Sequence, residues 1–215
     1  MLPNERNSPM TNVLKGLLAA VVATAAAPVI TAGAASASTT QSVVVPCSAR
    51  STSAYFASWG DENRYFLSPG GDFQPGDTYP WSATGGAGTV ANGDPWNVMK
   101  VAHPASASIP PGGAETSMTF CVASNETAIR FFYRSPGVPG SALLVSLQTA
   151  NSTGASTNTL DIDGGAAGWT VSPVIDLPNL RNSSGQENIT IAFSPANNPA
   201  SWQVDNVMVD PFASL

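Results

Sequence analysis

Residues 189–211, ITIAFSPANNPASWQVDNVMVDP, form the stretch that decides the predicted fold. In its first part the apolar side chains of Ile189, Ile191 and Phe193 alternate with Thr, Ala and Ser. Alternation with a period of two is typical of a strand that buries one face. The following segment, SPANNPAS, is rich in Asn, Pro and Ser, which favour turns.

A second strand follows this loop. Regular alternation places Trp202, Val204 and Met208 on one face, and Gln203, Asp205, Val207 and Val209 on the other. We therefore expect two antiparallel strands joined by a polar loop, with further strands stacked onto this pair from upstream.

The composition indicates an all-β chain. Gly (19) and Pro (18) recur every several residues and separate short segments, which suits a β-sandwich better than helices. Although 10% of the residues are charged, 43% are hydrophobic, which is enough to build a core. The net charge is −6 and no basic cluster occurs, which argues against nucleic acid and an anionic membrane surface as partners.

The first 37 residues have the pattern of a secretory signal peptide. A weakly basic start precedes the uncharged apolar run GLLAAVVATAAAPVI (16–30), and ASA at 35–37 fits the cleavage pattern. An uncleaved membrane anchor is the alternative, but the run is shorter than the roughly 20 residues that span a bilayer. The predicted organisation is a signal peptide over 1–37, a linker or first strand over 38–46, and one β-sandwich domain over 47–215 of a secreted protein.

Export makes the two cysteines informative. Cys47 and Cys121 are the only cysteines, and in an oxidising compartment such a pair predicts one disulfide. Two buried free thiols are the alternative, and the spacing matches no zinc site. The bridge would connect the N-terminal segment to a central strand.

Further strands are expected in the middle of the chain. The segments MTFCVAS (118–124), TAIRFFYR (127–134) and ALLVSLQT (142–149) each read as a strand. The last two flank the turn SPGVPG and are expected to form a hairpin, whereas residues 105–116 are expected to be a loop.

Two motifs carry a resemblance to known proteins. The segments GGDFQPGDTYPWSATGGA (70–87) and WQVDNVMVDP (202–211) resemble the opening and closing strands of carbohydrate-binding-module-like jelly rolls, the galactose-binding-like sandwiches. Together with Cys47, SWGDENRYFLSPGGDF, FCVAS and IRFFYR, the layout also resembles a group of secreted proteins from high-GC Gram-positive bacteria. The resemblance implies a jelly-roll fold and an extracellular location, and it brings no activity with it.

The jelly-roll resemblance also implies a structural calcium ion. In many such modules an acid near the opening strand and the Asp of the last strand hold the ion. Asp205 matches the last strand, whereas Gln74 stands at the opening position, so Asp72 is the candidate substitute. The alternative for Asp205 is a carboxylate that satisfies backbone groups beside the closing strand.

Aromatic residues are the best indication of a ligand. Tyr79, Trp81 and Trp96 lie among Gly, Pro, Asp and Thr, and exposed rings there could stack on sugar rings. The alternative is that these rings cover the ends of the core. Trp59, Phe131 and Trp202 are expected in the core itself.

No motif amounts to a catalytic site. Glycan-active enzymes usually need two carboxylates, and Asp161 and Asp163 are paired in sequence, but a strand that ends in a turn at Gly164-Gly165 explains both. His103 is the single histidine, and the pattern G-x-S-x-G is absent. Arg130 and Arg134 share one strand face and either bind an acidic ligand or pair with local acids.

The sequence therefore supports three hypotheses. The first is a secreted, non-catalytic sandwich that binds glycan or cell-wall material as its partner. The second is a structural, surface-associated protein without a small ligand. The third is a glycan-active enzyme, which would need two facing carboxylates in a cleft. The oligomeric state is left open.

Overall fold

The structure is a computed structural model that describes residues 45–47, 50–100, 104–151, 154–197 and 200–210. The predicted signal peptide (1–37), most of the predicted linker (38–46) and His103 lie outside the described residues. Within those residues no helix has the length and apolarity to span a membrane.

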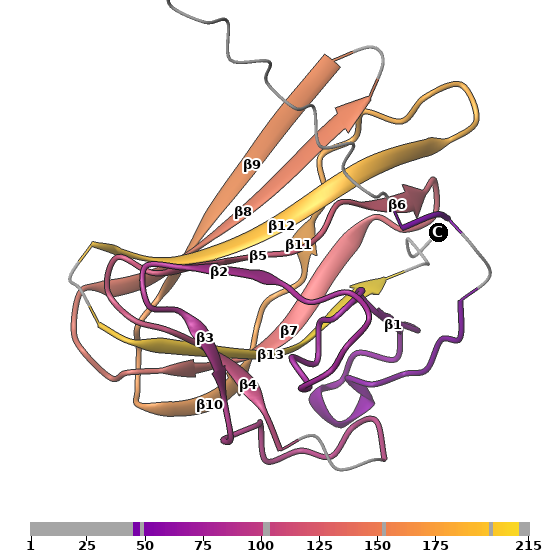
Figure 1. Ribbon diagram of the computed structural model, residues 1–215. Coiled ribbons are helices and arrows are strands. Elements are labelled where there is room, and N and C mark those ends of the chain that lie inside the picture. Colours follow the sequence, from indigo (N-terminus) through magenta and orange to yellow (C-terminus); the bar gives the residue numbers. More distant parts are fainter. Residues whose placement is uncertain (1–44, 48–49, 101–103, 152–153, 198–199, 211–215) are drawn as a thin grey trace, which may run out of the picture. The chain divides into compact units, whose positions relative to one another are not determined.

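Two antiparallel sheets make up the described part of the chain (Figure 1). The seven-stranded sheet has the order β10 (Gly168–Val171), β7 (Ala128–Ser135), β13 (Trp202–Asp210), β4 (Ser106–Ile109) and β3 (Gly88–Val90), with β1 (Phe66–Leu67) paired to β13 and β11 (Ile175–Asp176) paired to β7. The six-stranded sheet has the order β2 (Ser82–Thr84), β5 (Ala114–Thr116), β12 (Gln186–Asn197), β8 (Ser141–Asn151) and β9 (Gly154–Asp163), with β6 (Phe120–Ala123) paired to β12. The predicted all-β, jelly-roll-like sandwich is therefore confirmed.

The main core lies between the inner faces of the two sheets. In β12 the alternation found in the sequence is confirmed, since Ile189, Ile191 and Phe193 are buried and their neighbours are less so. Phe131 of β7 packs edge-on against Phe193, with ring centroids 4.8 Å apart. Side chains from both sheets thus interdigitate, as in other sandwiches.

A second, smaller cluster covers the outer face of the seven-stranded sheet. Phe132 and Met208 point outward from this sheet and are buried beneath Phe56 and Tyr65 of the segment before β1. Strand β7 therefore buries both of its faces, which explains why its sequence carries adjacent phenylalanines.

The two strands that decide the fold do not pair with each other. Strand β12 belongs to the six-stranded sheet and β13 to the seven-stranded sheet, so the loop between them crosses from one layer to the other. Strands β7 and β8, expected to form a hairpin, are divided between the two sheets in the same way. Both predictions of direct pairing were wrong, because alternation identifies the buried face of a strand and not its partner.

The predicted faces of β13 were also wrong beyond Asp205. The pairing of β13 with β7 shifts register between Asp205 and Met208, and Asn206 there has a φ of 48°. Such a bulge inserts an extra residue and exchanges the faces of the residues that follow. Val207 therefore joins the main core, whereas Met208 joins the outer cluster.

Two smaller findings concern the connections. Residues 105–116, expected to be a loop, contain β4 and β5, whose Ser- and Ala-rich sequences give a weak strand signal. The predicted disulfide between Cys47 and Cys121 is confirmed, and Val45 makes a parallel bridge to Phe120. The N-terminal segment is thus bound to β6, as expected.

Candidate functional site

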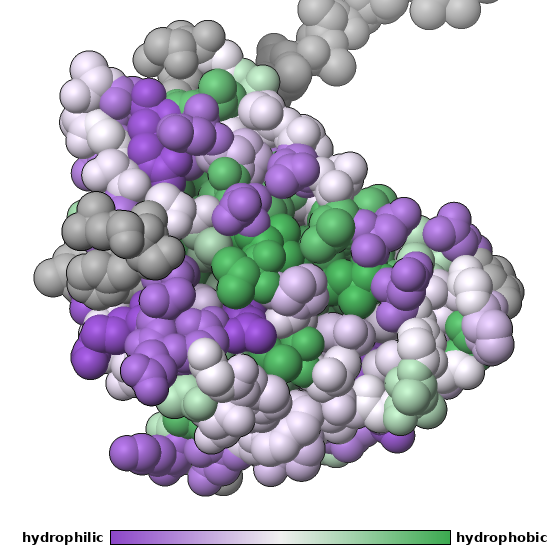
Figure 2. All heavy atoms as spheres, turned by 180° about the vertical axis from the view of Figure 1, so that it is seen from behind, coloured by the Kyte–Doolittle hydropathy of each residue, from purple (hydrophilic) through white to green (hydrophobic). Residues whose placement is uncertain are grey.

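Apolar side chains reach the surface in more than one place. Seen from behind, hydrophobic groups gather in the middle of the face among hydrophilic ones (Figure 2). Leu160 and Val174 are the large hydrophobic residues that are clearly exposed in the described part of the chain, at 37% and 48%. Neither residue lines one of the described pockets, whereas pockets and polar groups coincide on the outer face of the seven-stranded sheet.

The outer face of the seven-stranded sheet carries a row of side chains that crosses five strands. Register places the following residues side by side on β10, β7, β13, β4 and β3: Trp169, Arg134, Gln203, Ser108 and Gly88. Because directly opposite residues share a face, this row combines a ring, a guanidinium, an amide and a hydroxyl on one surface.

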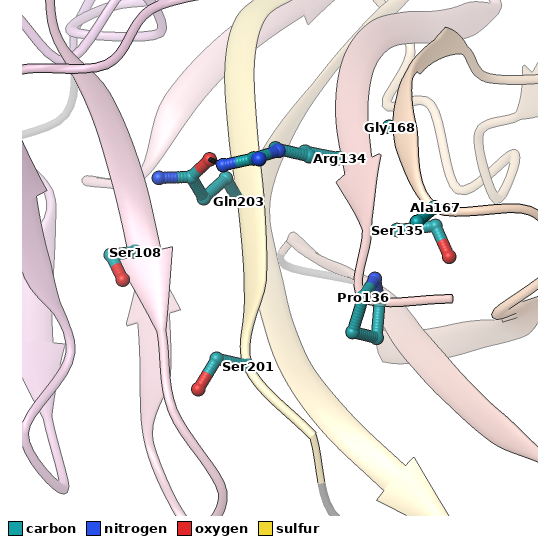
Figure 3. A pocket seen from close by; sticks show the side chains of 8 residues that line it. All are labelled: Ser108, Arg134, Ser135, Pro136, Ala167, Gly168, Ser201 and Gln203. Atoms are coloured by element: carbon teal, nitrogen blue, oxygen red, sulfur yellow. Dashed lines mark hydrogen bonds between the residues drawn. The ribbon is translucent and has the colours of Figure 1, made fainter. Parts of the chain in front are cut away.

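A pocket of about 250 Å³ lies on this row (Figure 3). We call it the polar pocket; it is lined by Ser108, Arg134, Ser135, Pro136, Ala167, Gly168, Ser201 and Gln203. Arg134 Nη1 donates a hydrogen bond to Gln203 Oε1 at 3.2 Å, which holds the guanidinium across β13. The lining offers hydrogen-bond donors and acceptors but no carboxylate.

A second pocket, of about 400 Å³, lies on the same face, beside Phe132. We call it the tryptophan pocket; it is lined by Ser58, Trp59, Trp96, Asn97 and Val98. The rings of Trp59 and Trp96 meet edge to face with centroids 5.2 Å apart, and each lies 5.1 Å from the ring of Phe132. Both rings are partly buried, so each retains some surface for a ligand.

Asn92, four residues before Trp96, contacts the polar pocket. Its side-chain amide donates to Gln203 Oε1 at 3.1 Å, the same oxygen that accepts from Arg134. On β7, Arg134 lies two residues beyond Phe132 on the same face, a spacing of about 7 Å along a strand. The polar pocket and the tryptophan pocket therefore lie on the same outer face of the seven-stranded sheet.

Buried carboxylates hold the loop that carries Trp96. The Asp94 amide donates to Asp205 Oδ2 at 2.9 Å, and Asp94 Oδ1 accepts the Trp96 amide at 2.8 Å. Asn206 donates its side-chain amide to Asp94 Oδ2 at 2.5 Å. Burial, together with the nearby charge of Asp94, raises the pKa of Asp205 to about 8, although its backbone hydrogen bonds act in the opposite direction.

An ion pair holds the segment that carries Trp59. Asp61 follows the short helix η1 (Ala57–Trp59), and its Oδ2 lies 2.6 Å from Arg130 Nη1 of β7. Tyr65 donates its hydroxyl to the same oxygen at 2.7 Å, and burial and this bond raise the pKa of Tyr65. Arg130 is therefore the arginine that pairs with a local acid, whereas Arg134 is exposed.

The structure does not bring the three predicted aromatic residues together. Trp81 is partly buried, is stacked on Phe193 at 5.6 Å, and donates its indole N–H to Pro69, so it closes the main core. Tyr79 lines a different pocket, beside Phe66. Trp96 lies in the tryptophan pocket, where its partner is Trp59.

The predicted calcium ligands lie in separate segments. Asp72 is buried in the turn before Phe73, and Asp205 is fully buried in β13, where its two oxygens accept the amides of Asp94 and Asn206. Among the described residues, no group of three or more His, Cys, Asp or Glu side chains is arranged to hold a metal. Asp205 thus acts as an anchor for the loop, and the calcium ion stays a prediction.

Three members of this surface were not recognised as site residues in the sequence. Trp59 was assigned to the core, and Trp169 and Gln203 carried no motif. Trp96 was recognised from its loop, and the shared face of Arg130 and Arg134 was visible because it depends on alternation within one strand. The remaining members come together through pairing across strands, which the sequence does not encode in a readable pattern.

Comparison with known proteins adds little at the level of sequence. No family model matches the chain, and no curated protein matches it. Several solved structures share the sandwich architecture at low identity.

A xylan-binding domain from Paenibacillus barcinonensis is 12% identical, with 66% of this chain and 93% of that chain covered and a TM-score of 0.44. A promiscuous carbohydrate-binding module of the β-sandwich superfamily is 12% identical, with 65% and 59% covered and a TM-score of 0.41, so the match spans less than two thirds of that chain. An arabinose-bound α-L-arabinofuranosidase is 19% identical, with 67% and 26% covered and a TM-score of 0.43. At TM-scores below 0.5, these similarities carry no function to this chain.

Proposed function

We propose that the chain is a secreted, non-catalytic β-sandwich that binds a glycan along the outer face of its seven-stranded sheet. The observation that carries this proposal is the pair of partly buried tryptophans, Trp59 and Trp96, on the same sheet face as a polar pocket. Sugars present apolar ring faces and hydroxyl edges, so they need both kinds of group. The expectation of secretion rests on residues 1–37 of the sequence.

The lining of the pockets favours binding over hydrolysis. Glycoside hydrolysis usually needs two carboxyl groups about 5 to 10 Å apart across a cleft. None of the three described pockets is lined by an Asp or Glu side chain. Asp161 and Asp163 are exposed on the edge strand β9, away from those linings.

The test is retention of the purified protein on insoluble polysaccharides: cellulose, chitin, xylan, β-glucan and peptidoglycan. We expect selective retention that falls about 5- to 150-fold in Trp96→Ala and Trp59→Ala, taking for a ring stacked on a sugar the roughly 1–3 kcal/mol that a ring stacked on a nucleic-acid base contributes. Ser58→Arg, at the exposed rim of the tryptophan pocket, should block binding without removing a packed ring.

Tyr79→Ala is the matched control, since Tyr79 lines a pocket elsewhere. Its retention should equal that of the unaltered protein. If Tyr79→Ala abolishes retention and the tryptophan variants do not, the site is misplaced. If the protein is retained on none of these polysaccharides, glycan binding is excluded for those polymers, and a structural, surface-associated role takes its place.

A further inference from the structure

The polar pocket has an unusual charge environment for this protein. The chain has a net charge of −6, and most of its described arginines are held by acids. Arg50 lies 2.6 Å from Glu126, Arg130 lies 2.6 Å from Asp61, and Arg181 lies 2.8 Å from Glu187. Arg134 belongs to none of the ion pairs found among the described residues, and its described partner is the neutral amide of Gln203.

The guanidinium of Arg134 therefore has unused capacity. It carries five N–H donors, and the bond to Gln203 uses one of them. The planar fork of a guanidinium matches a carboxylate, and the resulting pair of charge-assisted hydrogen bonds is stronger than bonds to neutral groups. The other polar groups of the lining are an amide and serine hydroxyls, which suit sugar hydroxyls.

The acids near this pocket lie outside its lining. Asp205 follows Gln203 by two residues, but it is fully buried, its two oxygens accept the backbone amides of Asp94 and Asn206, and burial raises its pKa. The pocket lining itself contains no acid. With a volume of about 250 Å³, it holds roughly eight water molecules at ~30 Å³ each, which is the scale of one sugar residue.

We propose that the polar pocket binds a carboxylate-bearing sugar residue, a uronic acid, with the Arg134 guanidinium on its carboxylate and Gln203 fixing the guanidinium. This inference rests on the proposed glycan-binding function and specifies the class of glycan. The tryptophan pocket, on the same sheet face, would hold a neighbouring sugar of the same chain.

The test uses matched polymers that differ only in whether their sugars carry a carboxylate or the hydroxymethyl group that replaces it on reduction. Affinity for polygalacturonate and glucuronoxylan is measured by calorimetry against the same polymers after chemical reduction of their carboxyl groups. We expect at least tenfold weaker binding to the reduced polymers, and a comparable loss in Arg134→Gln, because charged hydrogen bonds contribute about 1.5–3 kcal/mol. The affinity of Arg134→Lys should lie between those of the unaltered protein and Arg134→Gln, since lysine keeps the charge and loses the planar fork of the guanidinium.

Arg64→Gln is the control for net charge. Arg64 is exposed and bonds to Thr52, away from the pocket lining, so this variant should bind as the unaltered protein does. Arg134 is itself exposed, so its substitution should leave the melting temperature unchanged.

The outcomes separate this inference from the proposed function. Equal binding to native and reduced polymers, with a loss in Trp96→Ala, overturns the uronic acid assignment and leaves glycan binding in place. Chondroitin with and without sulfate is measured in the same way. Tighter binding to the sulfated form, without binding to polygalacturonate, would mean that the pocket selects sulfate and would likewise overturn the uronic acid assignment. Charge-dependent binding that Arg134→Gln does not alter overturns the role of Arg134. Binding to no polymer of either kind overturns both proposals.

Discussion

Stability should fall as the pH rises from 5 to 7, because of the buried carboxyl of Asp205. Asp205 is 0% exposed, and burial raises its pKa to about 8. In the unfolded chain an aspartate has a pKa of about 3.9. Between about pH 4 and pH 8 the folded protein therefore keeps a proton that the unfolded chain has released.

The size of the effect follows from this one proton. One proton of difference lowers the free energy of unfolding by about 1.4 kcal/mol per pH unit, or about 3 kcal/mol from pH 5 to pH 7. The contribution is complete below about pH 4 and is lost as the pH rises through the folded pKa. Burial also raises the pKa of Glu115 to about 7, which adds a slope of the same sign.

The assay is urea unfolding followed by tryptophan fluorescence at pH 5, 6, 7 and 8. Asp205→Asn replaces the protonated carboxyl by an amide that does not titrate, so the free energy of unfolding of the variant, relative to that of the unaltered protein, should rise by about 3 kcal/mol from pH 5 to pH 7. Its stability should change less with pH than that of the unaltered protein, and Asp161→Asn, at an exposed position, should leave the slope unchanged. If Asp205→Asn keeps the full slope, the raised pKa is not the cause and the reasoning is refuted.

Three other measurements address the scaffold. Replacing both Cys47 and Cys121 by Ser should lower the free energy of unfolding, measured by urea unfolding, by about 4 kcal/mol, because the bridge closes a loop with a sequence separation of 74. A loss under about 1 kcal/mol would contradict this expectation. Arg130→Met removes the cation from the Asp61 carboxylate, which keeps its bond from Tyr65, and should cost up to about 3 kcal/mol, the lower end for a buried pair. Adding Asp61→Asn should restore part of this loss, and losses that simply add would count against a coupled pair. If calcium binds at Asp205 and Asp72, millimolar CaCl2 should raise the melting temperature above its value in EDTA; equal temperatures would exclude a stabilising ion.

Alternation within single strands was the part of the fold that the sequence predicted well. It identified the buried face of β12, and it placed Phe131 of β7 in the core. The structure confirms both predictions. Sheet membership was not predictable, because a period of two describes faces and leaves partners open. The bulge at Asn206 was equally hidden, although Asn is among the residues that tolerate a positive φ.

The site was less predictable than the fold for a related reason. Trp96 was recognised because it lies in a loop rich in turn residues, whereas Trp59 was assigned to the core. Their meeting depends on two loops that each cross the outer face of the same sheet and pack on Phe132. Contacts between loops far apart in sequence are set by the finished tertiary structure, so composition and motifs do not report them.

The tryptophan pocket is held from both sides before any ligand arrives. The segment of Trp59 is fixed to β7 by the ion pair between Asp61 and Arg130. The loop of Trp96 is fixed to β13 by the hydrogen bond from the Asp94 amide to the buried Asp205 carboxyl group. Binding to rings that are already in place avoids the entropy of ordering them, and this lowers the cost of association. Loosening either anchor should therefore weaken the proposed glycan binding, even though neither Asp61 nor Asp205 lines one of the described pockets. Because both loops pack on Phe132, the two losses should be less than additive when combined, as expected for groups that share one partner.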